Sequence, residues 1–145
     1  MARAQHRSVS ARRWNRVASP DVLGWRTVIA LSRNDPRARA TLAAAREADV
    51  EVSIPSAVVA ETVRGSAEDA SVNRVIKAVG EVTAADEGTG RVAGALLGTA
   101  RSTSTVDALV VASAIELGGG VVLTGDPDDL ELLAGGHPEV VISAL

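Results

Sequence analysis

Carboxylates stand at the ends of two apolar segments in the second half of the chain. Asp107 lies near the start of segment 104–117, whose other residues are almost all apolar or small. A helix that is apolar nearly all round belongs inside a domain. Asp126, Asp128 and Asp129 follow the apolar run 121–123. Three acids in four residues repel one another, and a cation would relieve this repulsion. The pattern leaves open whether these acids meet Asp107 and what they would hold.

Asp107 and Asp126 also have purely structural explanations. Ser104 and Asp107 are spaced as in a capping box, where an acid in the first turn favours the helix dipole. Asp126 precedes Pro127 and can cap the helix that begins there. Against this explanation, Asp107 should lie near the domain interior, where a carboxylate needs a partner.

Glu61 is a weaker candidate when it is considered alone. It belongs to the segment 55–65, and it can simply pair with Arg64 on an exposed helix face. The two histidines do not suggest a nucleophilic triad, because His6 lies in a basic arm and His137 in a turn. Nothing in the chain therefore competes with the carboxylates as a chemical centre.

Composition excludes several other classes of site. The chain has no cysteine, so disulfides, thiolate zinc sites and cysteine nucleophiles are absent. Its only aromatic residues among Phe, Tyr and Trp are Trp14 and Trp25, which excludes an aromatic base-stacking platform in the main body. No apolar run approaches the roughly 18 residues of a membrane span. We therefore expect no membrane contact. A cytoplasmic location is also expected, although composition alone does not fix the compartment.

Charge is distributed unevenly along the 145 residues. Residues 1–20 contain five arginines and no acid, whereas the remainder carries 10 basic and 18 acidic side chains, a net charge of −8. We interpret residues 1–20 as a basic and disordered extension, with contact to nucleic acid as the alternative. Residues 21–145 are expected to form one domain.

Apolar runs and breaker residues predict an alternation of strands and helices. Strands are expected at 22–31 (interrupted at 24–26), 50–54, 81–84, 121–123 and 139–145. Helices are expected at 36–48, 55–65, 66–79, 86–100, 104–117 and 127–134. This order favours an α/β domain with a mainly parallel sheet. In such sheets, sites form at the carboxyl ends of the strands, where Asp126 is expected.

Three segments together resemble the PIN domain family, and specifically the VapC-type toxins of toxin–antitoxin pairs. They are Ile54–Gly65 with Glu61, Thr105–Ala114 with Asp107, and Val122–Leu130 with Asp126 and Asp129. The resemblance implies a three-layer α/β/α fold and a ribonuclease that depends on Mg²⁺ or Mn²⁺. It implies that Glu61, Asp107 and Asp126 are catalytic metal ligands, with Asp129 as a further and more variable acid.

The resemblance also implies partners. These are an RNA substrate, a small VapB-like antitoxin that blocks the acidic pocket, and a second copy of the chain in a homodimer. The chemistry is consistent with clustered acids, since a bound cation polarises a phosphoryl oxygen and generates hydroxide from water.

One position departs from the pattern of the family. Its members carry an acid on the first strand, and here that position falls on Gly24. Asp21 is three residues earlier, on the opposite face of a strand and roughly 10 Å away. Two alternatives therefore accompany the ribonuclease hypothesis: a weakened or silent PIN-like binding module, and a structural domain whose acids only cap helices.

Overall fold

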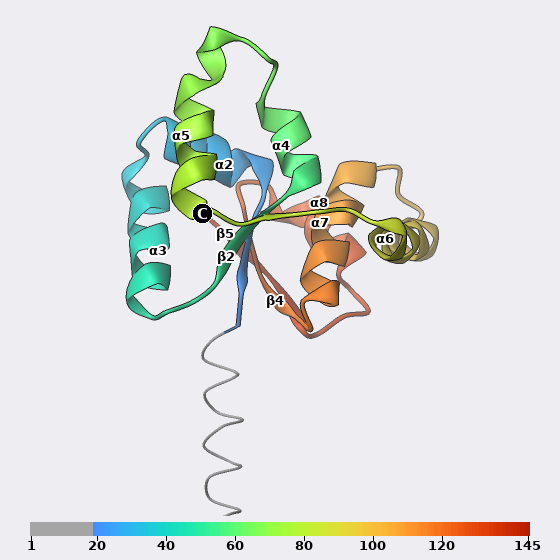
Figure 1. The fold of residues 1–145 in the computed structure, drawn as a ribbon. Coiled ribbons are helices and arrows are strands. Elements are labelled where there is room, and N and C mark those ends of the chain that lie inside the picture. The colour runs from blue at the N-terminus through green and yellow to red at the C-terminus, as the bar shows by residue number, and fades with distance from the viewer. Residues whose placement is uncertain (1–18) are drawn as a thin grey trace, which may run out of the picture.

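Residues 19–145 are described by a computed structural model, and they form an α/β/α domain around a five-stranded sheet (Figure 1). Every pair of neighbouring strands in it is parallel, in the order β3-β2-β1-β4-β5. The strands are β1 (Asp21–Leu23), β2 (Val52–Pro55), β3 (Val82–Thr83), β4 (Gly120–Thr124) and β5 (Val140–Ala144). The predicted extension of residues 1–20 lies outside the described residues, except for its last two.

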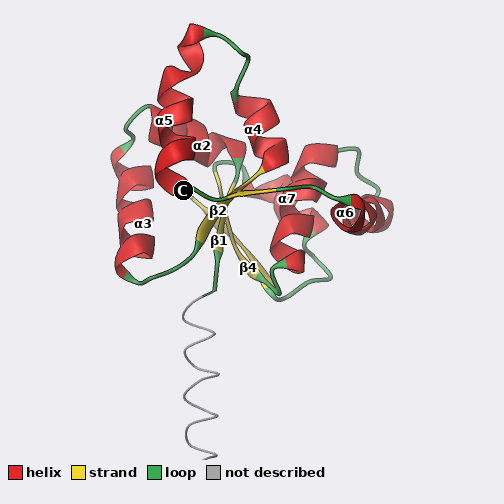
Figure 2. Ribbon diagram, in the orientation of Figure 1, coloured by secondary structure: helices red, strands yellow, loops and turns green. Residues whose placement is uncertain are grey.

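Helices cover both faces of this sheet, as Figure 2 shows. They are α2 (Trp25–Ser32), α3 (Pro36–Glu47), α4 (Ser56–Thr62), α5 (Ala70–Val79), α6 (Glu87–Ala100), α7 (Thr105–Glu116) and α8 (Pro127–Leu133), with a 3₁₀ turn at Ala67–Asp69. Helices α2, α3 and α5 lie on one side, and α6, α7 and α8 lie on the other (Figure 1). Helix α4 contacts both α2 and α7. The predicted three-layer fold is thus confirmed.

Helix α7 is the central element of the core. Five of its apolar residues are almost fully buried: Ala108, Val110, Val111, Ala112 and Ala114. Small and β-branched side chains let this helix pack closely across β1, β2, β4 and β5. Its nearly continuous apolar surface is explained by burial against the sheet on one side and against α6 and α8 on the other.

The prediction of a first strand over residues 22–31 is wrong beyond Leu23. The chain leaves β1 at Gly24, which occupies the N-cap position of α2. The buried residues of α2 are Thr27, Val28, Leu31 and Ser32, a spacing that follows the helical period instead of strand alternation. Residues 25–31 are apolar enough for either element, so tertiary packing decides between them.

Two hydrogen bonds fix the start of α2 against β4. The carbonyl oxygen of Leu123 accepts the backbone N–H of Gly24 at 2.9 Å and the buried hydroxyl of Thr27 at 2.8 Å. These bonds hold the end of β1 and the first turn of α2 beside the end of β4. They therefore determine where the side chains of α2's first turn can point.

The order of the strands reverses between β1 and β4. From β1 the chain proceeds to β2 and β3 on one side, and it later returns to β4 and β5 on the other. Ligands of open α/β sheets bind outside the carboxyl ends of strands at such a switch point. None of the helices of residues 19–145 is long and apolar enough to span a membrane.

Candidate metal centre

A small acidic pocket lies at the switch point between β1 and β4. It has a volume of about 60 Å³, which is room for an ion and a few water molecules. Its lining residues come from the start of α2, from α7, from the end of β4 and from the start of α8: Gly24, Trp25, Arg26, Asp107, Val110, Thr124, Asp126, Asp129 and Leu130. Three of the four predicted metal ligands therefore line one pocket.

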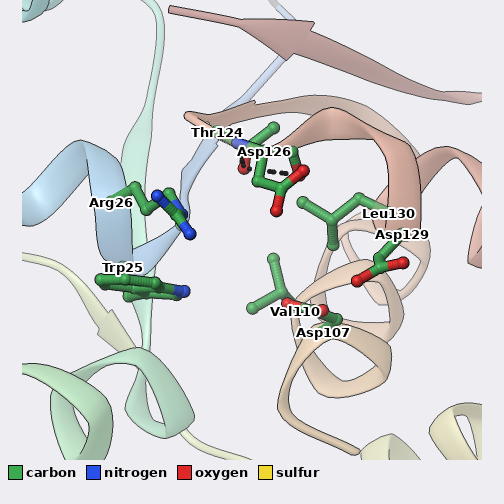
Figure 3. Close-up of a pocket in the computed structure, with 9 residues that line it drawn as sticks. Trp25, Arg26, Asp107, Val110, Thr124, Asp126, Asp129 and Leu130 are labelled. Carbon is green, nitrogen blue, oxygen red and sulfur yellow. Dashed lines mark hydrogen bonds between the residues drawn. The ribbon is translucent and has the colours of Figure 1, made fainter. Parts of the chain in front are cut away.

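The carboxylate of Asp126 is directed into this pocket by a local turn (Figure 3). The hydroxyl oxygen of Thr124 accepts the backbone N–H of Asp126 at 3.1 Å and faces its carbonyl oxygen at 3.3 Å. Asp126 occupies the N-cap position of α8, but its side chain makes no capping hydrogen bond. The helix-cap explanation of this acid is therefore wrong, and its carboxylate is left for another partner.

Asp107 enters the same pocket from the first turn of α7. Ser104, the N-cap residue of that helix, makes no side-chain capping bond, so the predicted capping box does not form. Burial raises the pKa of Asp107, and the nearby charges of Asp129 and Asp126 raise it further. A cation bound among these three acids would relieve their mutual repulsion.

Glu61 lies on α4, outside the residues that line the pocket but close to Asp107. Burial raises the pKa of Glu61, the charge of Asp107 raises it further, and the charge of Arg64 opposes both effects. The predicted ion pair with Arg64 does not form, because that guanidinium donates to the carbonyl oxygens of Ala60 and Val63. The Oε1 atom of Glu61 is buried and lacks a hydrogen-bond partner among the described residues.

The donor set fits a hard divalent cation in its chemistry. Asp107, Asp126 and Asp129 offer oxygen ligands around one small cavity, and Glu61, whose Oε1 atom has no hydrogen-bond partner among the described residues, is close enough for the charge of Asp107 to raise its pKa. Within residues 19–145, however, no three acidic side chains converge closely enough to hold one ion as they stand. Binding would therefore require the carboxylates to rotate toward a common centre.

The missing first-strand acid is visible in the geometry. Gly24 lines the pocket, whereas Asp21 starts β1 and pairs in register with Val52 and Val121, at the opposite end of the strand. Asp21 is not among the residues that line the pocket. The interpretation of Asp21 as a poor substitute thus agrees with its position. Gly24 itself lies just after β1 instead of on it, which corrects its predicted placement.

Three residues of the pocket wall are not predicted from the sequence. Thr124 positions Asp126, and Trp25 and Arg26 form the wall opposite the acids (Figure 3). The prediction of one interrupted strand over residues 22–31 assigns the side chains of Trp25 and Arg26 to no site. The signal that the sequence offers is Gly24, which is followed by two bulky residues after a short apolar run.

Fold and site together define a class: a parallel α/β/α domain with an acidic pocket at its switch point. The PIN domain family model matches residues 27–135, more than half of the chain, and the chain belongs to that family. No curated protein sequence matches it.

Solved structures with the same fold include chains from bacterial complexes. Residues of this chain superpose on a chain of VapBC2 from Rickettsia felis bound to a promoter DNA fragment, with a TM-score of 0.68 and 15% identity over 86% of this chain and 98% of that one. A chain of a toxin–antitoxin complex from Klebsiella pneumoniae superposes with a TM-score of 0.63 and 18% sequence identity, over 83% of this chain and 95% of that one. A chain of FitAcB from Neisseria gonorrhoeae superposes with a TM-score of 0.59 and 16% sequence identity, over 84% of this chain and 95% of that one.

Proposed function

We propose that the protein is a metal-dependent endoribonuclease of the VapC type, the toxin of a toxin–antitoxin pair. The observation that carries the proposal is the gathering of Asp107, from α7, with Asp126 and Asp129, from the start of α8, around one small pocket. The capping box predicted for Ser104 and Asp107 does not form, and the side chain of Asp126 makes no capping hydrogen bond. The family match and the similarity to chains of toxin–antitoxin complexes support the same function.

In this proposal Asp107, Asp126 and Asp129 would hold Mg²⁺ or Mn²⁺, and Glu61 would contribute a further carboxylate near Asp107. The bound cation supplies a polarised phosphoryl oxygen and an activated water. Thr124 keeps the carboxylate of Asp126 turned toward the pocket through its bond to the Asp126 backbone. Burial and the charge of Asp107 raise the pKa of Glu61, so this carboxylate accepts a proton more readily than a solvent-exposed one.

A small antitoxin is the proposed partner, since chains of similar fold occur in complexes described as toxin–antitoxin complexes. It would neutralise the toxin by covering the acidic pocket. A homodimer and a cytoplasmic location are part of the same proposal.

The main alternative is a weakened or silent binding module of the same fold. Gly24 in place of an acid favours it, as does the lack of three converging acids within residues 19–145. Cleavage of a structured RNA mixture should be measured with Mg²⁺, with Mn²⁺ and with EDTA. Asp126→Asn is the informative variant, and Asp128→Asn is its matched control, because Asp128 is an exposed acid of the same helix outside the pocket.

Metal-dependent cleavage that is lost in Asp126→Asn and retained in Asp128→Asn would support the ribonuclease. Cleavage that persists in EDTA would contradict the metal mechanism. If the parent binds RNA or an antitoxin but does not cleave under any of these conditions, the silent binding module is the correct alternative.

A further inference from the structure

Trp25 and Arg26, which we call the Trp25–Arg26 wall, separate the acidic pocket from a larger groove. Both residues are exposed and line both hollows. The groove is open, has a volume of about 730 Å³ and runs along α2 to the start of α3. Its further lining includes Ile29, Arg33 and Asp35. A ligand that reaches the acidic pocket along this groove must therefore pass the wall.

The side chain of Arg26 is held in place by a cation–π contact and by packing against the backbone. Its guanidinium carbon lies 4.7 Å from the centroid of the Trp25 ring. On the other side, a Cβ placed on Gly125 would come within 2.9 Å of Arg26 Cδ and 3.0 Å of Arg26 Cβ. Arg26 thus packs against a backbone that only glycine leaves open. It forms no ion pair with any of residues 19–145.

The charge of the groove is complementary to a phosphodiester chain. Arg26 and Arg33 are both exposed there. The nearby carboxylate of Asp35 already accepts the backbone N–H of Ala38 at 3.0 Å and caps α3. Two cations therefore face the groove beside one acid that is already engaged, whereas the acidic pocket next to them repels an anion unless a cation is present.

Trp25 adds the one aromatic surface that the described chain possesses. It is 36% exposed although Arg26 covers part of its ring. A platform for successive bases needs several aromatic residues, but one ring is sufficient for one base. The acidic pocket, at about 60 Å³, is much smaller than the groove, at about 730 Å³, so the groove offers more room for a base.

We infer that the Trp25–Arg26 wall is the binding site for the nucleotide that flanks the scissile phosphate of a single-stranded RNA. Its base stacks on Trp25, and its phosphate binds Arg26, with Arg33 farther along the groove. This inference rests on the proposed ribonuclease function and deepens it. An aromatic ring beside a fixed cation favours RNA over an acidic protein segment, since the ring adds nothing to the recognition of carboxylates alone.

Trp25 fluorescence provides a direct test in the full chain. Trp14→Phe leaves Trp25 as the sole tryptophan, and an oligonucleotide with uncleavable linkages allows Mg²⁺ to stay present during the titration. A uridine hexanucleotide of this kind should quench Trp25 emission, whereas a linear polyphosphate of similar length, which lacks bases, should not. Equal quenching by the oligonucleotide and by the polyphosphate would overturn the assignment, because charge alone would then explain the response.

Substitutions test each half of the wall by fluorescence anisotropy of a labelled oligonucleotide. Trp25→Ala should weaken binding about tenfold, the scale of one base stack. Arg26→Gln should weaken it and reduce the slope of log K against log salt by about 0.7, the value of one lost phosphate contact with a single strand. Gly125→Ala should act like Arg26→Gln, because the added methyl displaces Arg26.

Arg39→Gln is the matched control, since Arg39 is an exposed arginine of α3 that lies outside both hollows. The inference is wrong if thermal melting shows that all variants are folded and the wall variants bind the oligonucleotide as tightly as Arg39→Gln does. A cleavage assay then shows whether the proposed ribonuclease function fails as well. A parent that cleaves RNA with Mg²⁺ while the wall variants bind and cleave normally would reject only the wall.

Discussion

Asp107, on α7, lies close enough to Glu61, on α4, for its charge to act on the carboxylate of Glu61. The pKa of Glu61 is raised by burial and then by the charge of Asp107, and the Oε1 atom of Glu61 is buried without a hydrogen-bond partner. Such an arrangement costs stability in the metal-free protein. A bound cation would offset this cost, because both carboxylates would attract it.

Asp107→Asn should abolish Mg²⁺ binding without destabilising the metal-free protein. Removing one of several like charges relieves repulsion, so we expect a gain of up to about 1 kcal/mol, limited by the partial solvent exposure of the group. Ribonuclease activity should fall at least about a hundredfold, because loss of a ligand exceeds the loss of an outer-shell partner. Thermal melts with and without Mg²⁺ measure the first two effects.

Two results together would favour a purely structural role of Asp107 at the start of its helix. They are a clear loss of stability in Asp107→Asn and a melting temperature of the parent that does not respond to Mg²⁺. Glu68→Gln is a suitable control for the general effect of removing a charge. Glu68 is exposed in the 3₁₀ turn and lies outside the pocket.

The pH dependence of stability should differ between the parent and Asp107→Asn in EDTA. The folded-state pKa of Asp107 is raised above its ordinary value of 3.8. As the pH rises past 3.8, Asp107 ionises in the unfolded chain before it ionises in the folded protein. Its contribution to the free energy of unfolding therefore declines until the pH passes its folded-state pKa. The stability advantage of Asp107→Asn should therefore grow with pH above about 4 and vanish below it.

Urea denaturation from about pH 3 to about pH 8 measures this difference. Two other acids provide an internal contrast. Burial alone would raise the pKa of Asp69, but the N–H groups of Arg64, Gly65 and Ser66 lower it overall. The pKa of Asp86 is lowered by bonds from Thr89. Their stabilisation is present above the ordinary pKa and is lost as the pH falls, in both proteins. A constant difference between parent and variant across the range would refute the shift at Asp107.

Gly24→Asp should tighten Mg²⁺ binding about tenfold by adding an oxygen ligand, and it should raise ribonuclease activity. The backbone φ of −75° at Gly24 suits any residue. The new Cβ would lie 3.2 Å from the carbonyl oxygen of Leu123 and 3.8 Å from Thr124 Cβ. We therefore expect a cost of about 1 kcal/mol in stability, because Leu123 must shift slightly.

Isothermal titration with Mg²⁺ and cleavage assays measure these effects of Gly24→Asp. Asp21→Ala is the control and should change neither affinity nor activity, since Asp21 lies at the far end of β1. Loss of activity in Asp21→Ala would show that our assignment of the missing acid is wrong.

Deletion of residues 1–18 should leave the fold intact. The sheet pairing of the described chain begins at Pro20, whose carbonyl oxygen accepts the N–H of Val121 at 2.8 Å. We expect the melting temperature to change by less than about 4 °C. Removal of five arginines should weaken RNA binding at low salt and matter little at high salt. A large fall in melting temperature would show that these residues stabilise the domain.

The amino-acid sequence by itself determined most of the architecture. Alternating apolar runs and breaker residues predicted the helices from Pro36 onward, because local signals such as the Asp35 cap and the left-handed Gly80 act within a few residues. It also supplied the candidate acids, since carboxylates at the ends of buried elements are recognisable without a structure.

Tertiary structure alone decided which element residues 25–31 form and what the acids face. Their apolar content suits a strand or a helix, and the bonds from Gly24 and Thr27 to Leu123 depend on a contact with a residue about a hundred positions away. The same contact places Trp25 and Arg26 opposite Asp126. No local pattern encodes that juxtaposition, because it arises where β1 and β4 become neighbours in the sheet.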